Sequence, residues 1–221
     1  MSPAHSPSAR PTLSRERVVE AAVAFADEHG IDGLSMRKLA QSLGVEAMSL
    51  YHHVANKEDL IDGMVDAVFA EIDRPAPGVP WREAIRRRCL SLHEAMLRHP
   101  WAVGRLDSRR TPGLGTLGHH DAVIGCLRAG GLSADLTALA FATLDAYVYG
   151  FALQELAIPR RPDESYGDLA EDVLSQLPVE ELPNLAAFTA EHVAQPGYDF
   201  AETFEPGLDL VLDALEQRLA P

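Results

Sequence analysis

One stretch of 23 residues constrains the fold of this chain more than any other: residues 35–57, SMRKLAQSLGVEAMSLYHHVANK. Its apolar residues recur one helical turn apart up to Gly44, which predicts a first helix over residues 35–43. Glycine accepts the left-handed conformation that ends a helix, so the chain is expected to reverse at Gly44. A second helix is predicted over residues 46–54. Two short helices joined by such a turn are typical of a helix-turn-helix that binds DNA.

The outer face of the second predicted helix supports this interpretation. Leu50 and Val54 lie four residues apart and are expected to point into the core. The remaining side chains form a face without charge, and the segment ends at a lysine: Ala47, Met48, Ser49, Tyr51, His52, His53 and then Lys57. Hydroxyl and imidazole groups can bond base edges or phosphates, and a methyl or thioether group can contact thymine. The alternative is a plain helical hairpin with half-buried aromatic rings.

The same residues resemble the DNA-binding domain of the tetracycline-repressor (TetR) family. The resemblance covers roughly residues 13–72 and rests on the motifs GLSMRKLA, LGV, LYHHV and NK at residues 33–57. It implies that the DNA contacts include Arg37, Ser49, Tyr51, His53 and Lys57. The tetracycline-responsive members carry a Gln-Pro pair where this chain has Ala47 and Met48. We therefore do not expect their operator sequence here.

The chain is predicted to be all-α, with a small DNA-binding domain followed by a larger helical one. Residues 1–12 are expected to be a disordered tail, residues 13–56 a three-helix domain with the helix-turn-helix, and residues 57–73 a connecting helix. A proline-rich linker precedes residues 81–221, whose apolar residues keep a helical period. This last part is predicted to bind an effector and to form the dimer.

Charge is distributed unevenly over the 221 residues. The net charge is −14, of which residues 1–60 carry −2 and residues 61–221 carry −12. The acidic part would be repelled by phosphate, so double-stranded DNA is expected to meet the N-terminal part only.

Two predicted helices, Ala134–Ile158 and Phe204–Leu219, carry more apolar surface than a small bundle can bury. A helix that is apolar all round is buried in a core or in a subunit interface. We therefore expect these helices to pair with those of a second copy in a homodimer.

The sequence gives no indication of an enzyme, a cofactor or a metal site. It has no Gly-x-Ser-x-Gly motif and no glycine-rich phosphate loop. His119 and His120 are adjacent, so on a helix they point about 100° apart and cannot easily bind one ion. Cys89 and Cys126 suit buried thiols in a reducing cytosol. No apolar run or signal peptide indicates a membrane, and a cytoplasmic location is expected.

The C-terminal half instead supplies aromatic and polar residues that suit a small-molecule pocket. The candidates are His93, Trp101, His120, Tyr147, Phe151 and Gln154. Each of them taken alone is better explained as an ordinary core or capping residue. The family resemblance implies an effector pocket in these helices. Gln154 stands where tetracycline-responsive members use a carboxylate for a magnesium complex, so a tetracycline–magnesium ligand is not expected.

These observations predict a transcriptional regulator: a repressor that a small hydrophobic, aromatic effector releases from a palindromic operator. A ligand that strengthens DNA binding remains an alternative. So does a helical small-molecule-binding or interaction protein whose helix-turn-helix no longer binds DNA.

Overall fold

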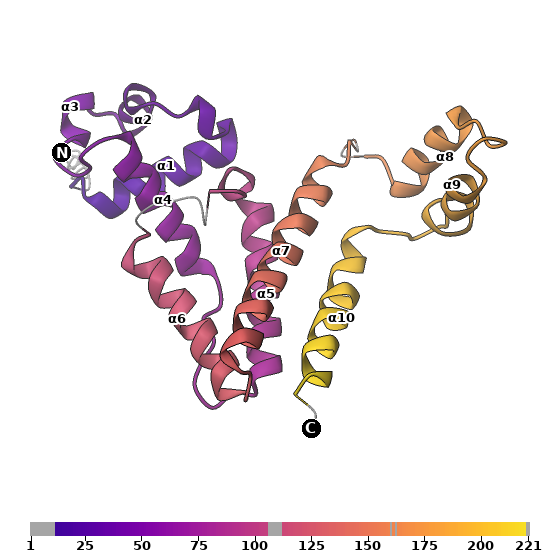
Figure 1. Ribbon diagram of the computed structural model, residues 1–221. Coiled ribbons are helices and arrows are strands. Elements are labelled where there is room, and N and C mark those ends of the chain that lie inside the picture. Colours follow the sequence, from indigo (N-terminus) through magenta and orange to yellow (C-terminus); the bar gives the residue numbers. More distant parts are fainter. Residues whose placement is uncertain (1–11, 106–111, 160, 162, 220–221) are drawn as a thin grey trace, which may run out of the picture. The chain divides into compact units, whose positions relative to one another are not determined.

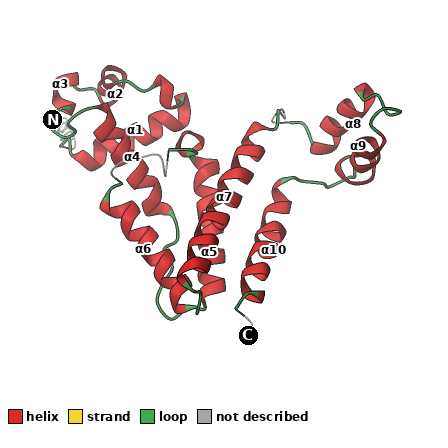
Figure 2. Ribbon diagram, viewed as in Figure 1, coloured by secondary structure: helices red, strands yellow, loops and turns green. Residues whose placement is uncertain are grey.

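The computed structural model describes residues 12–105, 112–159, 161 and 163–219, and these consist of helices and connecting turns without a strand (Figure 2). The expected tail lies almost wholly outside the described residues. The chain divides into two compact units, residues 1–71 with 98–117 and residues 72–97 with 118–221. The predicted boundary between residues 56 and 57 is not tested by this division and stays a prediction.

The first unit is built on the four N-terminal helices, α1 (Arg15–His29), α2 (Met36–Leu43), α3 (Ala47–Leu50) and α4 (Lys57–Glu71) (Figure 1). Ser14 caps α1 by accepting a hydrogen bond from the Arg17 amide, 3.3 Å away. Side chains from all four helices form a core without access to solvent; it includes Val18, Ala22, Leu39, Leu50, Leu60, Met64 and Val68. A 3₁₀ turn, Pro100–Ala102, completes the unit.

The second unit contains most of α5 (Trp81–Arg98) and α6 (Leu114–Ala129), followed by α7 (Ala134–Ala157), α8 (Tyr166–Gln176), α9 (Pro183–Phe188) and α10 (Phe204–Gln217). A π-helical turn, Thr189–Val193, continues α9. Helix α5 has four fully buried residues at helical spacing: Ile85, Cys89, Leu92 and Met96. Both cysteines are free thiols.

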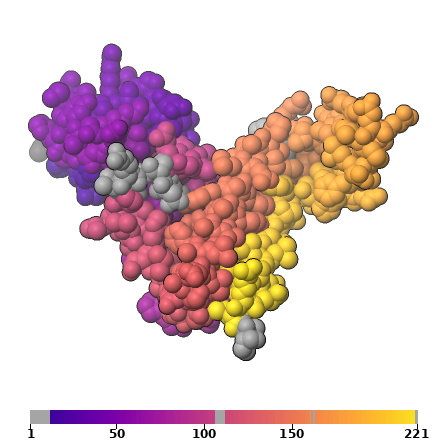
Figure 3. All heavy atoms as spheres, viewed as in Figure 1, coloured from indigo at the N-terminus to yellow at the C-terminus, as the bar shows by residue number. Residues whose placement is uncertain are grey.

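Helix α10 is attached to α5 by ion pairs as well as by apolar packing. Arg82 pairs with Asp213 (2.5 Å) and Glu216 (3.3 Å). Arg86 pairs with Glu205 (2.6 Å) and Asp209 (3.0 Å). On its other side α10 lies against α7, and the two helices run side by side (Figure 3).

Helix α7 is buried along one face only. Leu144, Val148 and Ala152 are inaccessible, whereas Leu139 and Leu153 are about half exposed. Within the described residues it is the one helix long and apolar enough to cross a membrane by composition, a criterion that core helices of soluble proteins also meet.

Candidate DNA-binding and effector sites

The turn of the helix-turn-helix has the predicted conformation. Gly44 has φ +67°, in the left-handed region, and its amide donates to the carbonyl of Gln41 at 3.2 Å. The next amide, that of Val45, reaches back to the carbonyl of Ala40 at 3.0 Å. These bonds end α2 and direct the chain into α3, as in the Schellman type of helix end.

The second helix of the motif is shorter than predicted. Regular α-helix covers Ala47–Leu50, and residues 51–53 continue as a turn closed by amides of His53 and Val54 on the Leu50 carbonyl. The carbonyl of His53 does not continue a helix because it accepts a hydrogen bond from Arg15 Nη1, 3.1 Å away. The predicted inward residues, Leu50 and Val54, are both buried.

The candidate DNA contacts lie at the surface of the first unit. Met48 is 70% exposed and Tyr51 45%. The others are exposed or half-buried: Arg37, His52 and Lys57 are exposed, and Ala47, Ser49 and His53 are half-buried. All eight therefore keep surface that is accessible to solvent, which contact with DNA requires.

A network centred on Asp59 fixes the segment that follows α3. Its carboxylate accepts two hydrogen bonds from Arg15, at 2.7 and 2.9 Å, and one from the amide of Ala55 at 2.7 Å. Asn56 caps α4 through the amide of Asp59, at 2.9 Å. The Arg15 guanidinium and the Ala55 amide hold the pKa of Asp59 below its usual value. The start of α1 and the residues that follow α3 are thus joined by charge-assisted hydrogen bonds.

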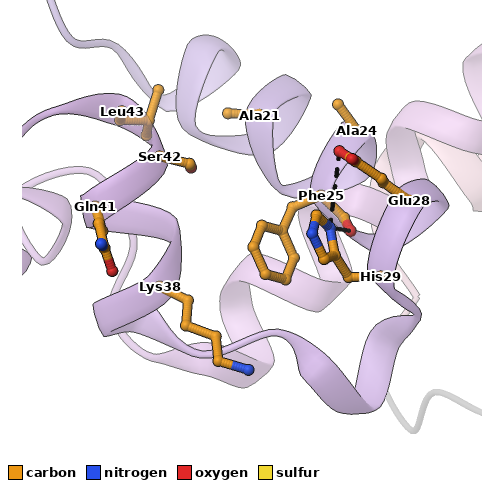
Figure 4. Close-up of a pocket in the computed structure, with 9 residues that line it drawn as sticks. All are labelled: Ala21, Ala24, Phe25, Glu28, His29, Lys38, Gln41, Ser42 and Leu43. Carbon is orange, nitrogen blue, oxygen red and sulfur yellow. Dashed lines mark hydrogen bonds and ion pairs between the residues drawn. The ribbon is translucent and has the colours of Figure 1, made fainter.

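A groove of about 620 Å³ lies between α1 and α2 in the same unit (Figure 4). Phe25 and His29 are stacked 4.5 Å apart on its α1 side, and Lys38 and Gln41 come from α2. None of the predicted effector residues lines this groove. We therefore do not assign the effector to it.

In the second unit the structure brings three predicted effector residues together. His93, Tyr147 and Phe151 surround Phe204, the first residue of α10. The His93 ring stacks on the Phe204 ring with 3.9 Å between the ring centroids. The Phe151 ring meets both of these rings edge-on, with centroid distances of 5.5 Å to His93 and 5.0 Å to Phe204. Tyr147 donates its hydroxyl proton to the Phe204 carbonyl at 2.8 Å. Glu155 bonds His93 Nε2 at 2.8 Å.

Tyr147 comes so close to α10 that only glycine fits opposite it. A Cβ atom at Gly207 would lie 2.2 Å from the Tyr147 hydroxyl oxygen. We call the five rings of His93, Tyr147, Phe151, Phe200 and Phe204 the aromatic cluster.

An apolar cavity of about 240 Å³ adjoins this cluster. It lies between α8, the π-helical turn and residues 198–200, and Phe200 forms part of its wall. The same ring stacks on Phe151 at 4.7 Å. The cavity and the aromatic cluster therefore share a side chain. Sequence reasoning did not find this cavity, since its walls come from segments with no periodicity in common.

The other three predicted effector residues lie elsewhere. Trp101 belongs to the first unit, where its indole nitrogen donates to Asp27 at 2.6 Å. Gln154 is exposed on α7. His120 contacts Phe141 edge-on at 5.2 Å, outside the aromatic cluster.

A buried polar cluster in the second unit was not predicted. Arg88 on α5 is 1% exposed and forms an ion pair with Asp145 on α7, which is 6% exposed. Arg88 Nε donates to Nε2 of His119 on α6, 3.2 Å away. Burial and the neighbouring guanidinium lower the pKa of His119 to about 3, so its imidazole is neutral. The sequence signal was available, because a carboxylate at position 145 within an apolar helix requires a buried partner.

Among the residues that the structure describes, no three His, Cys, Asp or Glu side chains are grouped as metal ligands.

Comparison with known proteins identifies both parts of the chain. The model of the bacterial regulatory proteins of the tetR family matches residues 18–64, and that of the tetracyclin repressor-like C-terminal domain matches residues 74–219. The HTH-type transcriptional repressor DrrR1 of Streptomyces coeruleorubidus is 34% identical over 223 residues, which cover 96% of this chain and 80% of that protein. An HTH-type transcriptional regulator of Saccharopolyspora erythraea is 36% identical over 71% of this chain and 66% of its own length.

A solved structure shows the same fold. The TetR family protein ActR of Streptomyces coelicolor, in complex with actinorhodin, superposes with a TM-score of 0.75 and 29% identity over 95% of this chain and 100% of that one. Together with the exposed helix-turn-helix, these matches show that the chain belongs to the tetracycline-repressor family and is a DNA-binding transcriptional regulator.

Proposed function

We propose that this regulator is a repressor that binds a palindromic operator as a homodimer and is released from it by a small, largely apolar effector. The observation that carries the proposal is that the chain combines an exposed recognition surface at residues 47–57 with an aromatic cluster and an adjoining cavity in the second unit. The relative DrrR1 is named a repressor, and ActR is solved in complex with actinorhodin.

The face offered to DNA carries few charges, so specificity has to come from its hydroxyl, imidazole and apolar groups. We assign Ser49, His53 and Met48 to base edges in the major groove. Tyr51, Arg37 and Lys57 are assigned to phosphates, which position the motif but carry no sequence information. Ala47 and His52 border the same surface.

The effector is assigned to the aromatic cluster of the second unit. His93, Tyr147 and Phe151 supply ring faces, and the His93 ring is held in place by its bond to Glu155. Trp101, His120 and Gln154 lie outside the aromatic cluster and are not part of this assignment. A ligand releases DNA only if it prefers a conformation in which the two recognition segments no longer match their half-sites.

The dimer is assigned to α7 and α10. Leu139 and Leu153 on α7 are 48% and 54% exposed, and Leu210 on α10 is 72% exposed. Exposed leucines on two neighbouring helices form the kind of self-complementary apolar face that a two-fold interface buries.

The test is a gel-shift titration of the full-length protein with the DNA upstream of its own gene and of the adjacent genes. A specific complex should form, and its association constant should fall steeply between about 50 and 200 mM salt because phosphate contacts release counterions. Absence of a complex, or a complex insensitive to salt, would instead support a protein whose helix-turn-helix no longer binds DNA.

A thermal-shift screen with compounds exported or degraded by neighbouring gene products then identifies the effector, and addition of the effector should abolish the shifted band. A band strengthened by the ligand would identify a corepressor.

A further inference from the structure

The buried ion pair between Arg88 and Asp145 has bonding capacity that the protein does not use. One bond joins Arg88 Nη1 to Asp145 Oδ1, and Arg88 Nε bonds His119. Arg88 Nη2 and Asp145 Oδ2 are both shielded from solvent, and neither has a hydrogen-bond partner within the described part of the chain. Native proteins satisfy nearly all buried polar atoms, so two unsatisfied atoms on one ion pair call for a partner from outside the chain.

The surroundings of the pair make this arrangement costly. Ile85 and Leu92, on the same helix as Arg88, are fully buried, as is Val148 beside Asp145 on α7. A buried ion pair recovers its desolvation cost only if its remaining donors and acceptors are also bonded, and an apolar pair of similar volume is often at least as stable. Stability alone therefore does not explain this pair.

We propose that Arg88 Nη2 and Asp145 Oδ2 bind the polar edge of the effector, and that the effector is an uncharged molecule carrying a hydrogen-bond acceptor beside a donor, as in a primary amide or a lactam. The acceptor accepts a hydrogen bond from Arg88 Nη2, and the donor donates one to Asp145 Oδ2. This inference rests on the proposed function and specifies the chemistry of its ligand.

The charge balance of the cluster favours an uncharged ligand. Arg88 and Asp145 cancel, and His119 is neutral. An anionic or cationic ligand would add an unpaired charge to a site closed to water, which is far more costly than an unpaired dipole. A group that only accepts, such as an ester, would satisfy Arg88 and leave the Asp145 oxygen unbonded.

A first experiment asks whether small molecules reach the pair. Asp145→Ala leaves the Arg88 guanidinium buried without its counter-ion, and acetate can replace the lost carboxylate. We expect sodium acetate to raise the melting temperature of Asp145→Ala by several degrees more than sodium chloride of equal ionic strength. The wild-type protein and the control Asp135→Ala, which removes an exposed carboxylate from the same helix, should respond equally to both salts.

A second experiment tests the ligand class with two probes that share one ring system. 2-Naphthamide has the donor and the acceptor, whereas methyl 2-naphthoate has the acceptor only. Calorimetry with the wild-type protein should show the amide binding roughly tenfold more tightly, the value of one hydrogen bond to a charged group. The preference should disappear in the double variant Arg88→Met, Asp145→Leu, which removes both charges together and so leaves no unpaired ion.

The proposal is overturned if acetate stabilises Asp145→Ala no more than chloride does. It is also overturned if the wild-type protein binds the amide no more tightly than the ester, or binds neither. Either result would show a sealed pair that holds a water molecule only. Operator binding by the wild-type protein without ligand is measured in parallel. If the protein binds its operator but fails the ligand tests, only this inference is wrong. If the protein does not bind its operator, the proposed function is wrong.

Discussion

Arg15 and Asp59 are 44 positions apart in the sequence, yet their side chains are joined by two hydrogen bonds of 2.7 and 2.9 Å. The pair connects the first residue of α1 to the first turn of α4, and between them in the sequence lie the proposed DNA contacts at residues 47–53. Arg15 also holds the carbonyl of His53. The position of residues 47–53 therefore depends on an ion pair that includes none of the proposed DNA contacts.

Replacement of Asp59 by Asn should weaken both folding and DNA binding. We expect the free energy of unfolding at neutral pH to fall by about 1 kcal/mol, a modest value because Arg15 and Asp59 are 42% and 32% exposed and solvent screens the pair. Urea denaturation measures this, with Glu58→Gln as the control for loss of an exposed acid in the same turn.

The pH dependence has a definite sign. The pKa of Asp59 is lowered from 3.8 in the folded protein, so its contribution to stability is complete above that pH and is lost as the pH falls through the lower, folded value. The wild-type protein should therefore lose more stability than Asp59→Asn on acidification below about pH 4. If the two proteins lost stability equally below about pH 4, the pKa of Asp59 would not differ between the folded and unfolded states.

Substitutions in the recognition segment should separate into two classes. Tyr51→Ala should weaken binding to all DNA sequences alike if its hydroxyl contacts a phosphate. Ser49→Ala should change the preferred base at one position of each half-site, at a cost of about 1–3 kcal/mol for the original base. Binding to a library of operator variants measures both, and Ser175→Ala on α8 controls for loss of an exposed hydroxyl. If Tyr51→Ala changed the base preference and Ser49→Ala weakened binding to all sequences alike, residues 47–53 would present a different face to DNA than we propose.

Lys57→Ala tests the phosphate contact at the start of α4. If the ammonium group neutralises one phosphate, the slope of log association constant against log salt should decrease in magnitude by about one unit per lysine. If binding became weaker with an unchanged slope, Lys57 would not be one of the residues that neutralise a phosphate.

Leu210→Glu should convert the dimer to a monomer. The side chain is 72% exposed in a single chain, and a buried carboxylate there would have no partner across the two-fold axis. Sedimentation velocity at micromolar concentration measures the change. Met48→Glu alters an equally exposed apolar residue in the other unit, at 70%, and should remain dimeric. A stable monomer formed by the wild-type chain would end this assignment.

The double substitution Tyr147→Ala, Phe151→Ala should abolish the response to an identified effector while the protein remains able to bind its operator. These rings form two sides of the aromatic cluster around Phe204. Isothermal titration with the effector measures the loss. Unchanged affinity would place the effector outside the cluster.

Local features of the fold could be predicted because they depend on neighbouring residues. Ser14, Gly44 and Asn56 act at the helix ends where capping and turn chemistry place them. The bounds of α5 likewise follow from local chemistry, because Pro80 and Pro100 flank a regular apolar stripe.

The sites depended on contacts that no periodicity reveals. Trp101 was predicted to line the effector pocket, but its partner is Asp27, 74 positions earlier. Arg88 and Asp145 are 57 positions apart, and the sequence of α5 does not distinguish Arg88 from its neighbours Arg86 and Arg87. Gln154 was chosen as a polar side chain on a helix expected to line the pocket, but it is exposed on α7.

The ion pairs between α5 and α10 have a consequence for assembly. Glu205, Asp209, Asp213 and Glu216 recur along one side of α10, and in a symmetric dimer two such acidic rows would approach each other. Arg82 and Arg86 of the same chain bind all four carboxylates and so satisfy them internally. The two guanidinium groups thereby halve the charge of the row in each chain, which lowers the repulsion between two α10 helices in a protein with a net charge of −14.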